Sequence, residues 1–436
     1  MSAMNLWADF DDNPDFQLAH TRQVRARRLS EQAVLAALRD WLLHDYAAAY
    51  CRSLAATRIF RRCYWVDALG TPQNPTQAIE VTQATASLLK DGDRTGKARA
   101  KDTKRLIHPV LQPVHALSQV LAGESRPITL HGFILETGSG KHGVVKTEQN
   151  GAASSPKAIA LPKDGGVVRA GWLEVAPALL ATIDQSAAIF LLHPFSKTLF
   201  SYEDLAPLYT RTAPTELFLL VSHKKMEVSL IPALRTPTGA AAFTALVRND
   251  RWKALLRENV ETESMISGLV EALVSSMGQH FLTVQRVALP MLIGPAQVEL
   301  APYTLIFATR RQDSLAAMND AICIYRRRLD EQSHQGVLME DWFDRQKKTR
   351  LEEHFQLLYE RVLQAGRALH LRRWPELRQR LLLADFGQFT IHDYDEAIAR
   401  LLRDGEACCE WRQRPAVNAG MEEQRIPGNE DTLLWK

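Results

Sequence analysis

The stretch AAIFLL, residues 187–192, is directly followed by His193 and indicates the fold class of the chain. Six apolar residues in a row that end at a polar residue are typical of a strand buried on both faces. The stretch ELFLLV, residues 216–221, repeats this pattern after a helical stretch at 203–209. A buried strand, a helix and a second buried strand predict parallel pairing through a crossover, with helices on both faces of the sheet.

Further strands and helices alternate on either side of this unit. β-branched and aromatic residues predict strands, and three- and four-residue spacing of apolar residues predicts helices. Strands are expected at 59–69, 128–135 and 303–309, and helices at 28–54, 172–183, 261–281 and 314–328. The alternation predicts an α/β fold with a doubly wound, Rossmann-like parallel sheet, whose ligand crevice lies beyond the carboxyl ends of the strands.

The composition is that of a globular protein. Of 436 residues, 46% are hydrophobic and 24% charged, and a net charge of +3 excludes a histone-like polycation. The five cysteines form no CxxC pair, so we expect neither a disulfide framework nor a zinc site. The sequence contains no signal peptide and no run of ~18 apolar residues, which predicts a cytoplasmic protein with no membrane partner.

Three segments of the chain differ in character. Residues 1–58 are predicted to be an N-terminal helical segment that packs on the core, and residues 59–335 the Rossmann-like α/β domain. Residues 336–436 are predicted to form a helical linker and a winged-helix-like domain, because two helical stretches separated by a turn precede a strand-like stretch. These stretches lie at 374–384, 393–402 and 407–412.

Two polar stretches are predicted to be loops. Residues 91–105 are dense in Lys and Arg, and they form either a solvated loop or a phosphate contact. Residues 137–166 are rich in Gly, Ser and Lys. Within them Gly138, Gly140 and Gly143 have the GxGxxG spacing of a phosphate loop, but no clear helix follows, so a flexible linker is the preferred interpretation.

The ends of three predicted strands carry residues suited to a ligand site. Asp67 and Gly70 follow one strand, where a carboxylate accepts hydrogen bonds and a small residue lets the backbone approach a ligand. Glu136 ends the next strand, a position typical of a residue that binds ribose hydroxyls. Because the carboxyl ends of parallel strands share an edge, we expect Asp67, Glu136 and His193 to face one cleft. The competing interpretation is ordinary turns with a solvated acid.

The third strand end is similar to the catalytic segment of amino-methyltransferases. In those enzymes an apolar strand is followed by a polar residue, a proline and an aromatic residue. The polar residue accepts protons of the target amino group, and the aromatic ring stacks on the base. His193, Pro194 and Phe195 occupy these positions. A histidine accepts such a proton only as the neutral tautomer.

Taken together, these stretches resemble the three-Cys-motif partner family, TcmP-like proteins with a methyltransferase-like Rossmann fold that are encoded beside a three-Cys-motif protein. YWVDALG (64–70) is similar to the family's YIDAFAG, FILE (133–136) to its FIE, and IFLLHPF (189–195) to its FFLDPFG. TELFLL (215–220) resembles its buried TE-containing strand. YTLIFAT (303–309), with Met318 in the following helix, is similar to its YxLIFAT segment, and the likeness spans about residues 30–330.

The resemblance implies a binding site for S-adenosylmethionine. Asp67, Gly70 and Glu136 are then the cofactor-binding residues, and the segment from His193 to Phe195 is catalytic. An alternative register takes residues 136–140 as the first loop and residues 155–156 as the family's GSP motif. That register accounts for the glycines but leaves Asp67 and the helix before it without a counterpart, so it ranks second.

The sequence also departs from the family's motifs. Leu69 lies inside the first loop, which is glycine-rich in the family, and Thr71 and Pro72 follow Gly70. His193 replaces the Asp of DPFG. Losing an oriented catalytic group costs roughly several kcal/mol of transition-state stabilisation. The expectation is therefore a pseudoenzyme, and the alternative is an active S-adenosylmethionine-dependent nucleic-acid methyltransferase.

Arginines of the C-terminal module suggest contacts with phosphates. The predicted helices and wing carry Arg378, Arg400, Arg412 and Arg414. We expect these arginines to bind phosphates in a salt-dependent way, with little recognition of the base sequence. Acidic residues make the module nearly neutral, so dimerisation is the competing interpretation. The expected partner is nucleic acid, DNA rather than RNA, within a bacterial defence or DNA-modification locus. A protein partner encoded nearby and an oligomer are further expectations.

Overall fold

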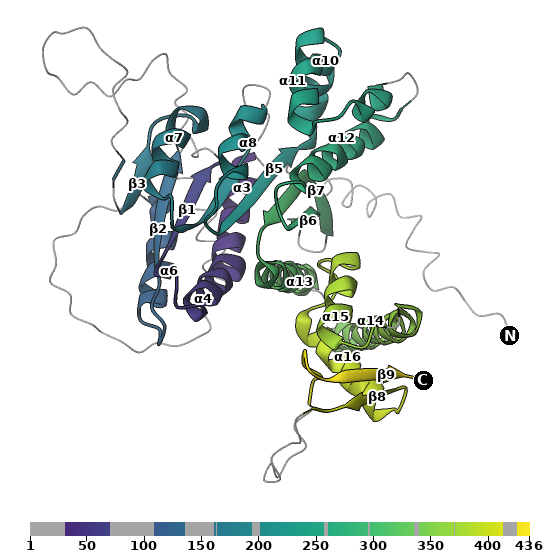
Figure 1. Cartoon of the computed structure of the whole chain (residues 1–436). Helices are drawn as coiled ribbons and strands as arrows, with labels where there is room; N and C mark the ends of the chain where they lie inside the picture. The colour runs from purple at the N-terminus through teal and green to yellow at the C-terminus, as the bar shows by residue number, and fades with distance from the viewer. Residues whose placement is uncertain are drawn as a thin grey trace, which may run out of the picture.

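The computed structural model describes residues 31–69, 109–135, 161–162, 164–193, 201–256, 260–294, 297–334, 340–369, 371–412 and 425–436. The first part of the chain is an α/β layered structure with a mostly parallel mixed sheet (Figure 1). A second part, made of helices and a two-stranded sheet, follows at the C-terminal end.

The described sheet contains seven strands. They are β1 (Arg62–Ala68), β2 (Thr129–Leu135), β3 (Gly165–Val168), β4 (Ala187–Leu192), β5 (Thr215–Ser222), β6 (Thr283–Gly294) and β7 (Gln297–Thr309). Their order across the sheet is β3-β2-β1-β4-β5-β7-β6. All neighbours from β3 to β5 pair in parallel, as predicted, and this arrangement is compatible with a Rossmann-like fold.

The prediction of a wholly parallel sheet was wrong for the last strand. β7 pairs antiparallel with both β5 and β6. The cause is β6, which was not predicted: it connects to β7 within a few residues, and a short connection joins only antiparallel strands. β3 was also missed. It begins inside the stretch predicted to be a loop, and its GGVV sequence has two glycines, which weaken the strand signal.

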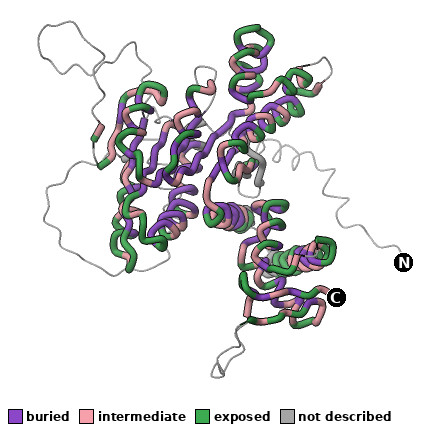
Figure 2. The backbone as a smooth tube through the Cα atoms, in the orientation of Figure 1, coloured by how far each residue is buried: buried purple, intermediate pink, exposed green. Residues whose placement is uncertain are grey.

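Helices cover both faces of the sheet. Along β1, Tyr64 and Val66 point to one face, and Cys63 and Trp65 to the other. The first face packs against α7 (Trp172–Thr182), α8 (Tyr202–Tyr209), η3 (Met226–Leu230), α10 (Ile231–Leu234), α11 (Pro237–Val247) and α12 (Thr262–Met277). The second packs against α3 (Glu31–Trp41), η1 (Leu42–Ala47), α4 (Ala48–Ala56), α6 (Gln112–Ala122) and α13 (Gln312–His334). The strands are therefore a buried layer between two helical layers (Figure 2).

The C-terminal part has a hydrophobic cluster of its own. It consists of α14 (Glu340–Leu369), α15 (Trp374–Ala384), α16 (Ile391–Arg403), β8 (Ala407–Glu410) and β9 (Thr432–Trp435), the last two paired antiparallel. α13 connects the two clusters, because Leu315 belongs to the C-terminal one and Met318 to the sheet's. A boundary at residues 335 and 336 therefore remains a prediction.

Among the described helices, none is by itself long and apolar enough to cross a membrane. One pair, His223–Leu234 and Pro237–Val247, reaches that length and composition only together, across a bend of 113°.

Candidate functional site

The carboxyl ends of β1, β2 and β4 lie side by side. Asp67, the last residue but one of β1, is in register with Ile134 of β2 and with Leu191 of β4. The parallel sheet therefore brings Asp67 close to the points at which β2 and β4 end, as the sequence predicted. Of the other residues predicted for this edge, Gly70, Glu136, Pro194 and Phe195 lie outside the described residues.

Asp67 is held by an arginine that the sequence reasoning did not identify. Its side chain is buried, with an exposed fraction of 1%, and it forms an ion pair with Arg39 in the last turn of α3. Arg39 donates one hydrogen bond from Nε to Oδ2 and a second, 3.1 Å long, from Nη2 to Oδ1. Oδ1 also accepts from the backbone N–H of Leu69 at 2.9 Å. The carboxylate thus fixes the start of the loop after β1.

These contacts do not fit a cofactor-binding role for Asp67. A carboxylate that holds a ribose or the methionine moiety of S-adenosylmethionine must present free acceptor positions to the ligand. In Asp67 both oxygens already accept from Arg39, and the side chain is almost fully withdrawn from solvent. Freeing it would leave a buried arginine without its counter-charge, which is strongly unfavourable. In this structure Asp67 therefore positions the backbone of Leu69, and its role in cofactor binding stays a prediction.

His193 directly follows β4 and is buried, with an exposed fraction of 8%. It lies two residues beyond Leu191, the residue of β4 that pairs with Asp67. The structure thus places His193 at the same edge of the sheet as Asp67, as predicted. A neutral imidazole at this position has one donor and one acceptor nitrogen, so it offers a single acceptor position where a carboxylate offers several.

A second buried acid, Glu216, lies near the amino end of β5, away from the carboxyl ends of the parallel strands. It is the second residue of β5, and its side chain is completely buried. Its carboxylate accepts hydrogen bonds from Tyr46 Oη (2.8 Å), Thr309 Oγ1 (2.9 Å) and Ser314 Oγ (3.0 Å). Because these donors come from η1, β7 and α13, the carboxyl group connects four elements of the core.

Burial raises the pKa of Glu216 to about 7, although the three hydroxyl donors favour the charged form and act against this rise. Burial and the nearby Glu216 also raise the pKa of Tyr46 and Tyr50 well above its ordinary value. A carboxyl group that titrates near neutrality is a common sign of a catalytic site. Glu216, however, is enclosed by the core and distant from the carboxyl ends of the strands, so its role is structural. Its signal in the sequence was a single acid within the apolar run TELFLLV.

Of the arginines predicted to bind nucleic acid, Arg378 and Arg412 have acidic partners within the C-terminal part. Arg378 donates from Nη1 to Asp395 Oδ1 at 2.6 Å, and Asp395 also accepts from Trp374 Nε1 at 2.9 Å. Arg412 forms an ion pair with Glu430, and both side chains are exposed. Arg414 lies outside the described residues. The partly buried Arg378 pair holds α15 against α16, whereas the exposed pair of Arg412 is weak and exchangeable.

Arg400 lies on α16 facing α14. Its guanidinium group is 5.7 Å from the ring centroids of both Phe355 and Tyr359, and its Nε is 3.9 Å from Asp404 Oδ2. Stacking on two aromatic rings holds an arginine side chain in place and favours packing between helices. This geometry supports a structural role for Arg400 in joining α16 to α14.

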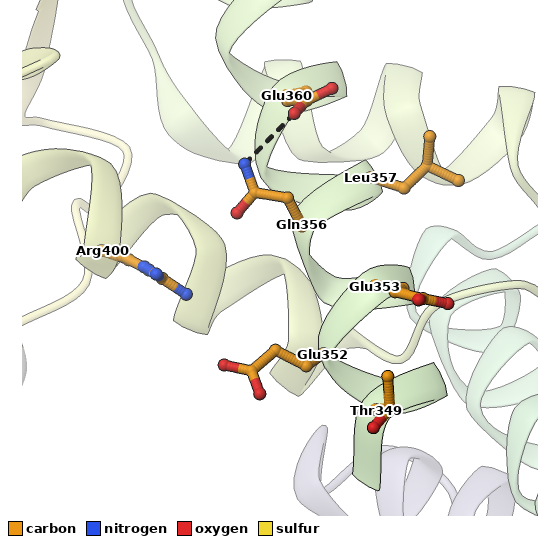
Figure 3. A pocket seen from close by; sticks show the side chains of 7 residues that line it. All are labelled: Thr349, Glu352, Glu353, Gln356, Leu357, Glu360 and Arg400. Atoms are coloured by element: carbon orange, nitrogen blue, oxygen red, sulfur yellow. Dashed lines mark hydrogen bonds between the residues drawn. The ribbon is translucent and has the colours of Figure 1, made fainter. Parts of the chain in front are cut away.

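A surface pocket of about 490 Å³ extends along α14 and reaches Arg400 (Figure 3). Three glutamates line it, and within it Gln356 donates to Glu360 at 3.2 Å. The remaining lining residues are Thr349, Glu352, Glu353 and Leu357. Carboxylates next to Arg400 repel phosphate, so this pocket does not support the predicted nucleic-acid contact at that residue.

In the described part of the chain, no group of three or more His, Cys, Asp or Glu side chains is arranged to hold a metal ion. Comparisons with protein-family models, with curated proteins and with solved structures found no match to this chain.

Proposed function

We propose that this chain is a methyltransferase-like protein of the three-Cys-motif partner type whose donor site has degenerated. On this proposal it acts without catalysis, as a nucleic-acid-associated component of a bacterial defence or DNA-modification locus. The observation that carries the proposal is the buried ion pair between Arg39 and Asp67, because it occupies the acid that the donor would need. His193, in place of an acidic residue at the end of β4, points the same way.

The strand order supports a methyltransferase-like sheet. The order β3-β2-β1-β4-β5 is that of a doubly wound Rossmann sheet, with its switch point between β1 and β4. The strand β7, reversed and inserted between β5 and β6, is typical of the methyltransferase-like variant of that fold. We further propose that α15, α16 and the β8–β9 hairpin form a winged helix, since their order along the chain is the order of that motif.

Calorimetric titration of the whole chain with S-adenosylmethionine tests the degenerate site. We expect neither heat of binding nor a thermal shift at millimolar S-adenosylmethionine. Saturable binding with micromolar affinity would refute a degenerate site and favour the second candidate, an active nucleic-acid methyltransferase. That candidate has its own support, since β1 and β4, whose ends carry Asp67 and His193, are neighbours.

A cellular assay separates the two candidates by residue. In a host that depends on this locus, a Glu136→Ala, His193→Ala double variant should retain function if the chain is an adaptor. It should lose function completely if those residues serve catalysis. Matched protein levels of variant and wild type are the control, because His193 is buried and its replacement can lower stability.

A further inference from the structure

Four exposed arginines lie where β1 and β2 begin. We call this side the amino edge of the sheet, and the candidate site lies at the other ends of these strands. Arg58 and Arg61 lie in the connection from α4 to β1, Arg62 is the first residue of β1, and Arg126 precedes β2. Between them Ile59 is 75% exposed. We call these five residues the amino-edge patch. The register pairs Arg62 with Thr129, so the connections that enter β1 and β2 are adjacent in space.

None of these four guanidinium groups forms an ion pair with another described residue. Nearby Arg52 does: its Nε is 2.9 Å from Glu124 Oε1. From Arg52 to Arg62 the chain carries four arginines and no acid. The amino-edge patch therefore presents uncompensated positive charge, unlike Arg378, Arg400 and Arg412, each of which has an acid nearby.

The backbone beneath the patch is held in place. The carbonyl of Arg61 accepts from the backbone N–H of Thr129 at 3.0 Å and from its Oγ1 at 3.2 Å. Arg58 has a φ of 61°, and its N–H donates to Ala55 O at 3.1 Å. A left-handed conformation favours glycine and is unfavourable for an arginine. An arginine thus occupies position 58 despite an unfavourable backbone conformation. The hydrogen-bonded turn fixes the position of its Cα atom.

We infer that the amino-edge patch binds the phosphate backbone of duplex DNA; this inference rests on the proposed nucleic-acid association. Guanidinium groups match phosphates with two parallel hydrogen bonds, and the patch offers donors only. Adjacent strands are about 4.8 Å apart and the phosphates of one DNA strand about 3.4 Å apart along the axis, so long arginine side chains from two strand starts reach at least two phosphates. An acidic protein segment is the competing occupant. We favour DNA because it follows from the proposed nucleic-acid association, whereas no feature of the described residues points to an acidic protein segment.

The test is fluorescence anisotropy with the full chain and a labelled DNA duplex of random sequence, over a range of salt concentrations. The variant R58Q/R61Q/R62Q should bind roughly tenfold or more weakly near 0.1 M salt, and its log–log salt slope should fall by about 2 to 3. The control variant K224Q/R235Q/R251Q removes the same charge from exposed positions elsewhere. It should bind as the wild type does. Melting curves verify that both variants fold.

Several outcomes overturn the inference. If wild type and R58Q/R61Q/R62Q bind the duplex equally, the patch is not the contact surface, while the proposed association stands. If both variants lose affinity alike, the effect is one of overall charge and the patch has no special role. If polyglutamate displaces the duplex at equal charge concentration, the occupant is an acidic protein. If the wild type binds no duplex at all, the nucleic-acid part of the proposed function fails together with the patch, whatever the S-adenosylmethionine titration shows.

Discussion

Arg39 and Asp67 are 28 residues apart in the sequence, yet two hydrogen bonds join them at the carboxyl edge of the sheet. Both side chains are buried. This pair joins α3 to the end of β1, and the same carboxylate accepts from the backbone N–H of Leu69.

Replacing Arg39 with Met should destabilise the protein by about 3–5 kcal/mol, because it leaves the Asp67 carboxylate buried without a counter-charge. Urea denaturation measures the loss. The control is Arg52→Met, which breaks an exposed pair with Glu124 and should cost about 1 kcal/mol or less. The double variant R39M/D67N should recover part of the stability. A cost for Arg39→Met as small as that for Arg52→Met would show that Asp67 is not truly isolated from water.

Glu216 should make the protein less stable as pH rises. Its folded-state pKa of about 7 lies above its ordinary value of 4.5, so the folded chain binds the proton more tightly than the unfolded chain. The stabilisation is fully present below pH 4.5 and is lost as pH rises to about 7. At roughly 1.4 kcal/mol per pH unit, this range corresponds to about 3 kcal/mol.

The measurement for Glu216 is the free energy of unfolding at several pH values, for the wild type and for Glu216→Gln. Glutamine stays neutral, and its Oε1 still accepts from the hydroxyl groups of Thr309 and Ser314, whereas its Nε2 donates to Tyr46 Oη instead of accepting from it. The difference between the two curves isolates residue 216 from the other titrating groups. Parallel curves across this pH range would contradict the prediction.

Asn319 should be needed to attach the C-terminal part to α13. Its completely buried side chain donates from Nδ2 to Phe389 O at 2.7 Å and accepts from Gly387 N at 2.8 Å. Asn319→Ala leaves both backbone groups without a partner and should cost about 2–6 kcal/mol, at roughly 1–3 kcal/mol for each group. Limited proteolysis should then cleave the variant faster between residues 385 and 390. Asn249→Ala, which loses only bonds within its own turn, is the control.

Gly366 should tolerate no side chain. A Cβ atom there would lie 2.4 Å from Trp435 of β9, whose indole also donates to Leu371 O at 3.0 Å. Gly366→Ala should therefore lower the stability of the C-terminal part by about 1–3 kcal/mol. Gly171→Ala is the matched control, since a Cβ there meets nothing within 4 Å. Thermal melting compares the two, and equal melting temperatures would contradict the packing argument.

Most helices and strands of the fold could be predicted from local sequence patterns. The apolar runs of β4 and β5 and the helical spacing in α7, α12, α13 and α16 are local patterns, so they predicted strands and helices close to their observed bounds. The same patterns located Asp67 and His193 at strand ends. A local pattern suffices here because side-chain periodicity depends only on the conformation of the segment itself.

The pairing of these elements and the contacts of the polar residues depend on the folded structure as a whole. The direction of β7 depends on its hydrogen bonds with β5 and β6, which the sequence of β7 alone does not reveal. The partner of Asp67 comes from a different helix, and the donors to Glu216 come from three separate elements. Burial and long-range hydrogen bonding exist only once the chain has folded. They, and not residue type, separate a ligand-binding acid from one that holds the core together.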